Sequence, residues 1–397
     1  MKTYDWIVVG NGLAGAALSY ELARQGAAVL LIDRALDPPS ATRFSYGGIP
    51  YWSGTTALTQ QLCREGIERY RQFSQELEAD TQFRELDLIL TVEPGADPEA
   101  IAQQYQKFEI VPQLISPAEA HQLEPQLDPD AIAGALSVRH GHVEPMALVA
   151  AYNQAFHRSG GDRFIAEVTG LVRIGDRVTG VTTPQQAYAA ANVVVAAGGL
   201  SRQLLQKSGI VVPIYFTQAE LIETPAVDFK LRSLVMPANL RRFELERLAS
   251  QPDTEALWQE PGHQIAAAIL DAGVVQLLDG RLRIGQISRL LTSPQPPVYS
   301  ASSEASIRAA TALLLPALAA VPGRWHQCLV SFSRDGVPLA GPVPGIKGLL
   351  VFAGFGGPFA ILPPTATRFA HWLTGKADPL IEQMQLSRFK HGLQVAV

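Results

Sequence analysis

Short apolar runs separated by glycine turns predict buried strands at several places along the chain. Residues 4–9 form one such run, and residues 28–32 form another. An apolar run of four to eight residues without polar alternation suits a parallel strand that is covered on both faces. Between the two runs, residues 16–25 carry apolar side chains at helical spacing and stop at Gly26. The first part of the chain therefore predicts strand, helix and strand in that order.

A glycine-rich turn joins the first predicted strand to the helix. Gly10, Gly12 and Gly15 complete a G-x-G-x-x-G pattern, and the second strand ends at Asp33. These glycines suit, in turn, a tight turn, close approach to a pyrophosphate, and close packing of helix on strand. The helix N-terminus offers N–H groups and partial positive charge to phosphates. Asp33 suits the ribose hydroxyls of an adenosine, so these offsets predict a dinucleotide site rather than a chance glycine cluster.

Five further blocks follow along the chain. They are residues 40–49 (S-A-T-R-F, then G-G-I), residues 142–148 (H-V-E-P, then Leu), residues 193–199 (V-V-V-A-A-G-G), residues 335–341 (D-G-V-P-L-A-G) and residues 354–358 (G-F-G-G-P). In this order they resemble the D-amino-acid-oxidase-like family of FAD-dependent oxidoreductases, especially its sarcosine-oxidase and glycine-oxidase branches. The turn at the start does not separate FAD from NAD, whereas the resemblance implies FAD.

The resemblance also implies how the chain surrounds the FAD. The segment with Thr42 and Arg43 would lie along the flavin, and the backbone of Val168 would face the adenine. The loop at residues 354–358 and the helix after it would face the pyrimidine side, where N–H groups stabilise the negative charge of the reduced ring. The expected cofactor contacts are Gly10, Gly12, Leu13, Ala14, Gly15, Asp33, Arg34, Thr42, Arg43, Gly47, Gly48, Ile49, Val168, Ala197, Gly198, Cys328, Asp335, Gly354, Phe355, Gly356, Gly357 and Pro358.

The fold class expected is α/β, with a discontinuous Rossmann-like FAD-binding domain and a second domain built on a mixed or antiparallel sheet. Residues 1–80, 140–212 and 325–397 are assigned to the FAD domain, because they hold buried strands and glycine turns. Residues 81–139 and 213–324 are assigned to a substrate domain, since they have more charge, proline and alternation. Residues 161–181 predict a small antiparallel unit, and residues 304–315 predict an amphipathic helix.

The resemblance is weakest where a substrate would bind. A buried substrate carboxylate favours an Arg or Lys partner. Glycine-oxidase relatives carry an arginine five residues before the D-x-x-P aspartate, where this chain has Val330, and sarcosine-oxidase relatives carry a lysine after the C-terminal glycine loop, where residues 359–361 are apolar. Either another cation replaces these anchors or the substrate is not a simple amino acid. The candidate cations are Arg43, Arg283, Arg289 and Arg334.

Among these, Arg43 is the preferred candidate because it lies in the flavin-facing segment, and Tyr215 is the second residue proposed for a catalytic role. Tyr46, Tyr51 and Gln218 are further candidates for the pocket, although each is also typical of a half-buried structural side chain. Cys328 lies seven residues before Asp335, the offset of the cysteine that carries covalent flavin in sarcosine-oxidase relatives. An inert buried thiol is the alternative for Cys328, and it is the favoured interpretation for Cys63.

Composition narrows the function classes. The chain has 397 residues, 47% hydrophobic and 17% charged, with a net charge of −5, which disfavours a nucleic-acid binder. Two cysteines cannot form a disulfide framework, and a reducing, cytoplasmic location is the default expectation. No apolar run reaches about 18 residues, so no transmembrane segment is expected. No spacing typical of a metal site or of a Ser or Cys nucleophile is present in the sequence.

The sequence thus predicts an FAD-dependent oxidoreductase that oxidises a C–N bond, or less favourably a C–O bond, of a small amine-type substrate by hydride transfer to flavin N5. Oxygen or another acceptor would then take the electrons. Two alternatives stay open at this point. One is a flavoprotein with little turnover that assists assembly of an electron-transfer complex, as some relatives do. The other is an NAD-only dehydrogenase, which would leave the C-terminal glycine loop without a role.

Overall fold

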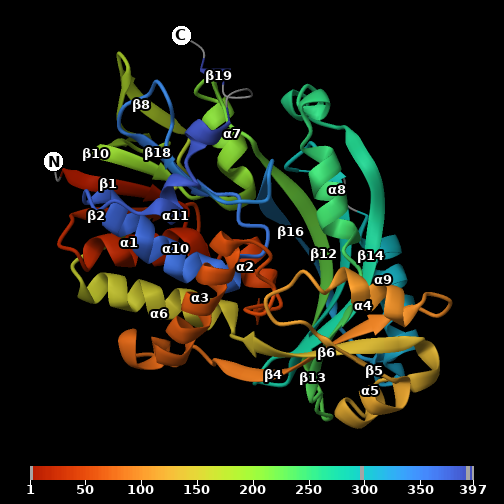
Figure 1. Cartoon of the computed structure of the whole chain (residues 1–397). Coiled ribbons are helices and arrows are strands. Elements are labelled where there is room, and N and C mark those ends of the chain that lie inside the picture. The colour runs from red at the N-terminus through yellow and green to blue at the C-terminus, as the bar shows by residue number, and fades with distance from the viewer. Residues whose placement is uncertain (1–2, 296–298, 390–393, 396–397) are drawn as a thin grey trace.

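Two large sheets form the framework of the protein. The computed structural model describes residues 3–295, 299–389 and 394–395. Figure 1 shows the two sheets side by side, with the chain passing between them several times. One sheet is mostly parallel and the other is mixed, which confirms the predicted α/β fold class.

The first sheet is mostly parallel. Strands β18, β10, β1, β2 and β7 run parallel to their neighbours, while β17 pairs antiparallel with β18 at one edge. A hairpin of β8 and β9 extends from β10. The strand bounds are β17 (Leu339–Pro342), β18 (Leu349–Ala353), β10 (Ala187–Val195), β1 (Tyr4–Val9), β2 (Val29–Asp33), β7 (Asp162–Ile165), β8 (Gly170–Ile174) and β9 (Arg177–Thr182).

The second sheet is mixed, and the only parallel pair found among its described strands is β13 with β4. Its main path runs β16-β12-β15-β14-β13-β4-β6-β3, and β5 pairs with β6. The strand bounds are β16 (Arg324–Ser333), β12 (Ile214–Ala226), β15 (Arg281–Leu291), β14 (Gln264–Gln276), β13 (Ser233–Pro237), β4 (Arg84–Val92), β6 (Gly134–His142), β3 (Gly48–Ile49) and β5 (Gln113–Ile115). A small separate pair joins β11 (Ile210–Val211) to β19 (Gln394–Val395).

Helices pack against both sheets. In Figure 1, α1, α3, α6 and α10 gather on one side of the parallel strands. Helix α9 packs against the second sheet, and α8 lies over another part of it. The helix bounds are α1 (Leu13–Ala23), α2 (Ala41–Phe44), α3 (Ala57–Glu76), α4 (Pro98–Gln104), α5 (Pro117–Leu123), α6 (Pro145–Arg158), α7 (Ser201–Gln206), α8 (Arg241–Ala249), α9 (Ser300–Leu314), α10 (Pro358–Leu373) and α11 (Pro379–Glu382).

The alternation of side chains explains why the sequence patterns of the two sheets differ. In β1, Val8 packs among the helices on one face, while Ile7 and Val9 pack in a separate core on the other face. Both faces are buried, so the strand reads as a continuous apolar run. In β4, by contrast, Ile89 packs toward α9, and Leu88 and Leu90 line a cavity on the opposite face. One face of the second sheet is therefore a core and the other is a pocket wall.

Most predicted elements form close to their expected positions, with local differences. The first helix begins at Leu13, directly after the glycine turn, and α9 spans Ser300–Leu314. The expectation of an antiparallel unit at residues 161–181 is correct only for the β8–β9 hairpin. Strand β7 instead pairs parallel with β2, because the chain returns from α6 to the edge of the first sheet. The described residues contain no helix with the length and apolar content needed to cross a bilayer.

The sheets do not divide at the expected domain boundaries. Strand β16 belongs to the second sheet, although it falls in the range 325–397, and β3 adds a strand from the first 80 residues to that sheet. These crossings bring two parts of the chain to the space between the sheets: residues 40–49, the segment expected to face the flavin, and strand β16. The assignment of ranges to domains remains a proposal at this level of detail.

Candidate active site

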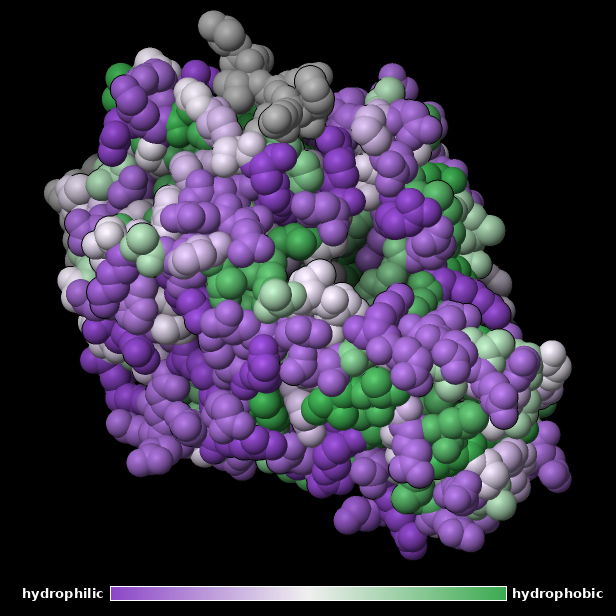
Figure 2. Space-filling view, viewed as in Figure 1, coloured by the Kyte–Doolittle hydropathy of each residue, from purple (hydrophilic) through white to green (hydrophobic). Residues whose placement is uncertain are grey.

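A large cavity lies where the two sheets meet. Its volume is about 1820 Å³, and its walls come from β1, β2, α2, β12, β16, α8 and the loop before α10. Figure 2 shows a hollow in the face of the molecule, with hydrophobic surface beside it. A cavity of this size exceeds the usual range for a small ligand alone, so it can hold a large cofactor together with a substrate.

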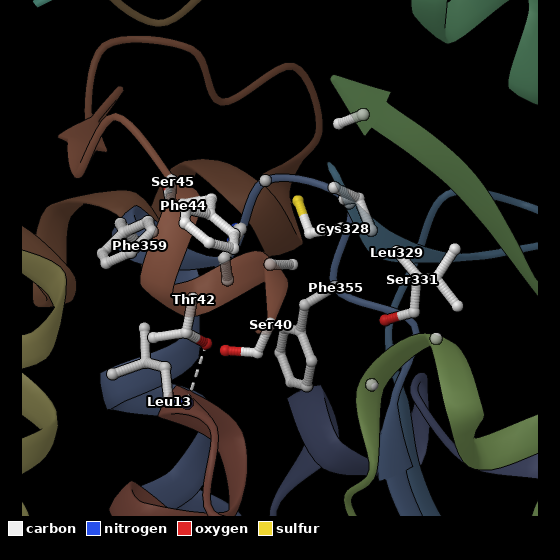
Figure 3. A pocket seen from close by; sticks show the side chains of 18 of the residues that line it. Leu13, Ser40, Thr42, Phe44, Ser45, Cys328, Leu329, Ser331, Phe355 and Phe359 are labelled. Atoms are coloured by element: carbon white, nitrogen blue, oxygen red, sulfur yellow. Dashed lines mark hydrogen bonds between the residues drawn. The ribbon is translucent and has the colours of Figure 1, made fainter. Parts of the chain in front are cut away.

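The N-terminal glycine turn forms one end of the cavity. Gly10 has a positive φ of 106°, and a Cβ atom on Gly15 would lie 1.7 Å from the Gly10 carbonyl oxygen. Helix α1 starts at Leu13 without a side-chain cap on Gly12, and the Leu13 N–H donates to Thr42 Oγ1 at 3.1 Å (Figure 3). Gly10, Gly12, Leu13 and Ala14 line the cavity, whereas Gly15 acts through close packing of the helix.

Asp33 ends β2 at the same end of the cavity. One of its oxygens accepts a hydrogen bond from the Asn11 backbone N–H at 2.5 Å, which holds the carboxylate beside the glycine turn. Asp33 and Arg34 both line the cavity. The second carboxylate oxygen has no hydrogen bond among the described residues, so it is available to a ribose hydroxyl.

The segment at residues 40–49 forms the cavity wall between the sheets. Ser40 caps α2 by accepting from the Arg43 backbone N–H, and Thr42 and Gly48 line the cavity. Gly47 does not line it; a Cβ atom there would lie 2.0 Å from the Val143 carbonyl oxygen, so the glycine serves packing. Ile49 is also buried away from the cavity.

A second glycine loop closes the cavity from the C-terminal part of the chain. Gly354 takes a positive φ of 82° after β18, and α10 begins at Pro358 with Gly357 as its N-cap. Phe355, Gly356, Gly357 and Pro358 line the cavity, and nothing lies within 4 Å of a Cβ atom built on Gly357. This loop can therefore receive a flat ligand against its backbone, next to the positive end of a helix dipole.

The remaining expected cofactor residues divide between the cavity wall and the surrounding structure. Val168, Ala197, Gly198 and Cys328 line the cavity. Asp335 does not, since its carboxylate pairs with Arg388 at 2.7 Å. Burial would raise the pKa of Asp335, but the hydrogen bonds and charge of Arg388, together with hydrogen bonds from Val337 and Ser333, lower it overall. Asp335 thus stabilises the turn between β16 and β17 rather than contacting a ligand.

The cations expected to bind a substrate are engaged elsewhere. Arg43 pairs with Asp37, Arg289 with Glu220, and Arg334 with Glu255. None of these side chains lies among the described residues that line the cavity. Arg283 is also outside the lining; it is fully buried between Glu223, Glu144 and the Ser45 carbonyl. Their placement does not support the substrate role that the sequence suggested, above all for Arg43.

The aromatic and polar candidates have mixed placements. Tyr215 is completely buried outside the cavity, where its hydroxyl donates to Glu255 at 2.5 Å, so its proposed catalytic role is not supported either. Tyr51 bonds Glu85 and also lies outside the lining. Tyr46 and Gln218 do line the cavity, and Tyr46 donates to the Gly273 carbonyl at 3.2 Å.

Comparison with known proteins identifies the family. Residues 5–372 match the family model described as "DAO: FAD dependent oxidoreductase". The chain belongs to the DAO family of FAD-dependent oxidoreductases. It is 26% identical to a glycine oxidase of Pseudomonas putida over 393 residues, which covers 95% of this chain and 96% of that protein.

Solved structures of this kind share the fold. The glycine oxidase of Geobacillus kaustophilus superposes with a TM-score of 0.79 at 21% identity, covering 98% of this chain and 100% of that one. An iminodiacetate oxidase from Chelativorans superposes with a TM-score of 0.77 at 17% identity, covering 96% of this chain and 98% of that one. Together with the family match, these relatives confirm the cofactor, FAD, and the enzyme class predicted from the sequence.

The residues of the cavity fit FAD. The two glycine loops leave backbone N–H groups and open space at opposite sides of one cavity, and Asp33 stands at the end where the adenosine ribose would bind. The flavin ring would then lie toward Gly48, Cys328 and the loop at residues 354–358. Burial raises the pKa of the Cys328 thiol to about 12, and Figure 3 shows its sulfur on the same side of the pocket as Phe44.

Sequence reasoning missed several charged residues that line the cavity, and two of them, Arg242 and Asp271, lie near the flavin-side part of it. Arg242 on α8 and Asp271 on β14 both line the cavity. Arg242 Nη2 donates to the Gly356 carbonyl at 3.3 Å, so its guanidinium lies at the flavin-side glycine loop. Neither residue belongs to a spaced motif. The adjacent pair Arg241-Arg242 is a signal that could have indicated Arg242, whereas Asp271 has no comparable signal.

A histidine also faces this space, and its low pKa makes it a poor base at neutral pH. His140 is buried in the cavity wall, and burial lowers its pKa to about 3. Its Nδ1 accepts from Trp52 Nε1 at 3.0 Å, which leaves the ring proton on Nε2. His140 therefore serves as a neutral wall residue that packs against Gly48.

Proposed function

We propose that this enzyme oxidises a C–N bond of a small amine or amino acid by transferring hydride to N5 of FAD, with oxygen or another acceptor taking the electrons. The observation that carries the proposal is the single cavity in which both glycine loops meet the open face of the second sheet. Bound FAD supplies the electron sink for a two-electron oxidation. The chain then has to position the substrate over the ring and keep water away from it.

The residues of the cavity suit these tasks. Phe355, Leu88, Leu234 and Met236 provide apolar walls that exclude water from the reacting carbon. Gly357, as N-cap of α10, directs the positive end of a helix dipole at the space where negative charge develops on reduction. No side chain needs to act as a metal ligand or nucleophile, and the part of the chain that the structure describes contains no cluster suited to a metal ion.

The named activities of the relatives favour C–N over C–O oxidation. Glycine oxidase and iminodiacetate oxidase relatives match nearly the full chain. One component of the anaerobic glycerol-3-phosphate dehydrogenase of Escherichia coli, an enzyme named for an alcohol, matches over only 42% of its own length. Because the relatives with full-length matches are oxidases and dehydrogenases, the assembly-factor alternative is disfavoured.

Anaerobic titration of the purified holoenzyme tests the proposal. Glycine, sarcosine, proline and a set of simple amines are added in turn while the flavin band near about 450 nm is followed. Bleaching by at least one of them is expected. A flavin that stays oxidised with every amine, yet is bleached by small alcohols, would replace C–N with C–O oxidation.

The same sample identifies the electron acceptor. The substrate-reduced enzyme is mixed with air-saturated buffer, and separately with an artificial electron acceptor under nitrogen. Reoxidation by oxygen within the turnover time identifies an oxidase. Reoxidation by the artificial acceptor alone identifies a dehydrogenase.

A further inference from the structure

Arg242 is a cavity cation whose position suits the carboxylate of a substrate. It lies at the second position of α8, and its Nη2 contacts the Gly356 carbonyl at 3.3 Å. The side chain is 20% exposed, so most of its surface is removed from water. A guanidinium in this place adjoins the glycine loop that, under the proposed function, covers the edge of the flavin ring.

The guanidinium of Arg242 is held by its neighbours while some donors stay available. Glu246, one turn along the helix, places Oε1 3.7 Å from Arg242 Nε, and Thr217 Oγ1 donates to the same carboxylate at 2.7 Å. The Phe243 ring centroid lies 4.9 Å from the Arg242 Cζ. Arg242 Nη1 has no hydrogen-bond partner among the described residues. A fixed guanidinium with free donors is suited to a carboxylate, which it can bind with two parallel hydrogen bonds.

Asp271 supplies a negative group to the same cavity. Asn239 Nδ2 donates to Asp271 Oδ1 at 3.1 Å, whereas Oδ2 has no hydrogen bond, and the described residues place no ion-pair partner within 4.0 Å of the carboxylate. The charges of Arg242 and Asp271 are close enough to influence each other. Asp271 also lies two residues from Gly273, whose carbonyl receives the hydroxyl of Tyr46 from the flavin-facing segment. The substrate end of the cavity therefore presents a positive and a negative group.

We propose that Arg242 binds the carboxylate of the substrate and that Asp271 receives its ammonium group, so the site takes zwitterionic amino acids in preference to simple amines. This inference rests on the proposed function. It explains how Val330 and residues 359–361 can be apolar where relatives carry a cation: the anchor comes from α8 instead. The positive charge reaches the same glycine loop from a different element.

Binding of carboxylates that cannot be oxidised tests Arg242 without turnover. Acetate and benzoate are titrated into the oxidised holoenzyme, and the dissociation constant is read from the change in the flavin spectrum. Arg242→Met is expected to weaken binding about 30-fold, as loss of a charge-assisted hydrogen-bond pair predicts, and Arg242→Lys less. Arg71→Met, which removes an exposed cation paired with Glu68 on α3 and outside the cavity lining, is expected to change it by less than about threefold.

Pairs of an amino acid and the matching amine test whether the site prefers zwitterionic substrates. Alanine is compared with ethylamine, and proline with pyrrolidine, as reductants of the flavin. The wild type is expected to prefer each amino acid to its amine, and Arg242→Met is expected to remove that preference. Asp271→Asn is expected to weaken amino-acid binding while leaving benzoate binding within about threefold.

The possible outcomes separate the two proposals. Unchanged benzoate and acetate binding in Arg242→Met overturns the anchor, even if amino acids still reduce the flavin. Arg242-dependent carboxylate binding in an enzyme that no amine reduces keeps the anchor and overturns the proposed C–N oxidation. Should Arg242→Met lose FAD, Arg242→Gln, which keeps much of the side-chain volume, decides by the same spectral titration, and equal binding in that variant also overturns the anchor.

Discussion

The two ends of the cavity are built by different means. At the cofactor end, backbone groups of two glycine loops and the start of two helices face the ligand. In the first loop, a Cβ atom would lie 2.6 Å from a backbone oxygen at Gly10 and 1.7 Å from one at Gly15. At the substrate end, the polar groups are side chains on α8, β14 and β12. A site made of backbone restricts the residue types that can form it, whereas a site made of side chains can draw its charge from any element that reaches the space.

One methyl group added at the cofactor end tests how strongly this end depends on backbone packing. Gly15→Ala should raise the helix propensity of α1 by up to about 1 kcal/mol. The added Cβ would however meet the Gly10 carbonyl oxygen at 1.7 Å, and this backbone clash dominates. We expect the variant to purify without FAD or to be insoluble, as judged by the ratio of flavin to protein absorbance.

A matched control uses the same methyl group at a site that can adjust. Gly170→Ala, in the β8–β9 hairpin, places its Cβ 3.2 Å from the Thr182 hydroxyl, which can rotate away. It should keep a full complement of FAD. Equal flavin content in the two variants would show that close packing of α1 is not required for the cofactor end.

The same difference between backbone and side-chain sites explains how much of the structure could be predicted from the sequence. Residues 4–33 could be interpreted because every part of the strand–turn–helix–strand unit has a local signature in glycine, apolar run or terminal acid. The crossing of β3 and β16 into the second sheet could not be predicted, because their partners are distant in the sequence. Arg43 was preferred for its position in the flavin-facing segment and Arg334 was a further candidate, yet their side chains pair with Asp37 and with the distant Glu255.

At the substrate end, Glu246 is a positioning residue for Arg242. Glu246→Gln can still accept from Thr217, but it removes the charge that holds the guanidinium. We expect the KM for an amino acid to rise about tenfold with kcat changed little, and the KM for the corresponding amine to stay the same. Steady-state kinetics with alanine and ethylamine measure this split.

The control for Glu246 is Glu68→Gln on α3, outside the cavity lining, where an exposed carboxylate pairs with exposed Arg71 at 2.6 Å. It should leave both KM values within about twofold. An equal rise in KM for alanine and ethylamine in Glu246→Gln would point to a general change of the helix, and would remove Glu246 from its positioning role.

The carboxylate of Asp271 should lower the stability of the folded protein at neutral pH. Desolvation raises the pKa of Asp271, opposed in smaller part by Asn239, Arg242 and Arg241, while Glu93 adds to the rise. The folded protein then holds this proton more tightly than the unfolded chain does. Stability is therefore lost as the pH rises from the ordinary aspartate pKa through the raised one, and the loss persists at neutral pH.

Asp271→Asn should remove that loss. In the ligand-free holoenzyme we expect its melting temperature to exceed that of the wild type by about 2 °C at pH 7, with the difference shrinking toward pH 4. Thermal melts across this pH range test it. A variant that is less stable than the wild type at pH 7 would mean that the Asp271 carboxylate stabilises the fold, and that its charge is satisfied without a substrate.

Substitution of Cys328 is expected to have the smallest effect. This side chain lies at the cofactor end, and we expect its thiol not to react with the flavin. Its sulfur lines the cavity within an apolar cluster of Phe44, Ala219 and Leu221. With a pKa of about 12, the thiol stays almost entirely protonated at pH 7, and only the thiolate could attack the flavin ring. Acid precipitation should leave FAD in the supernatant, and Cys328→Ser should keep the flavin content and spectrum. A yellow pellet from the wild type that is lost in Cys328→Ser would show that bound FAD itself lowers the pKa of this thiol, and that the cofactor end also depends on one reactive side chain.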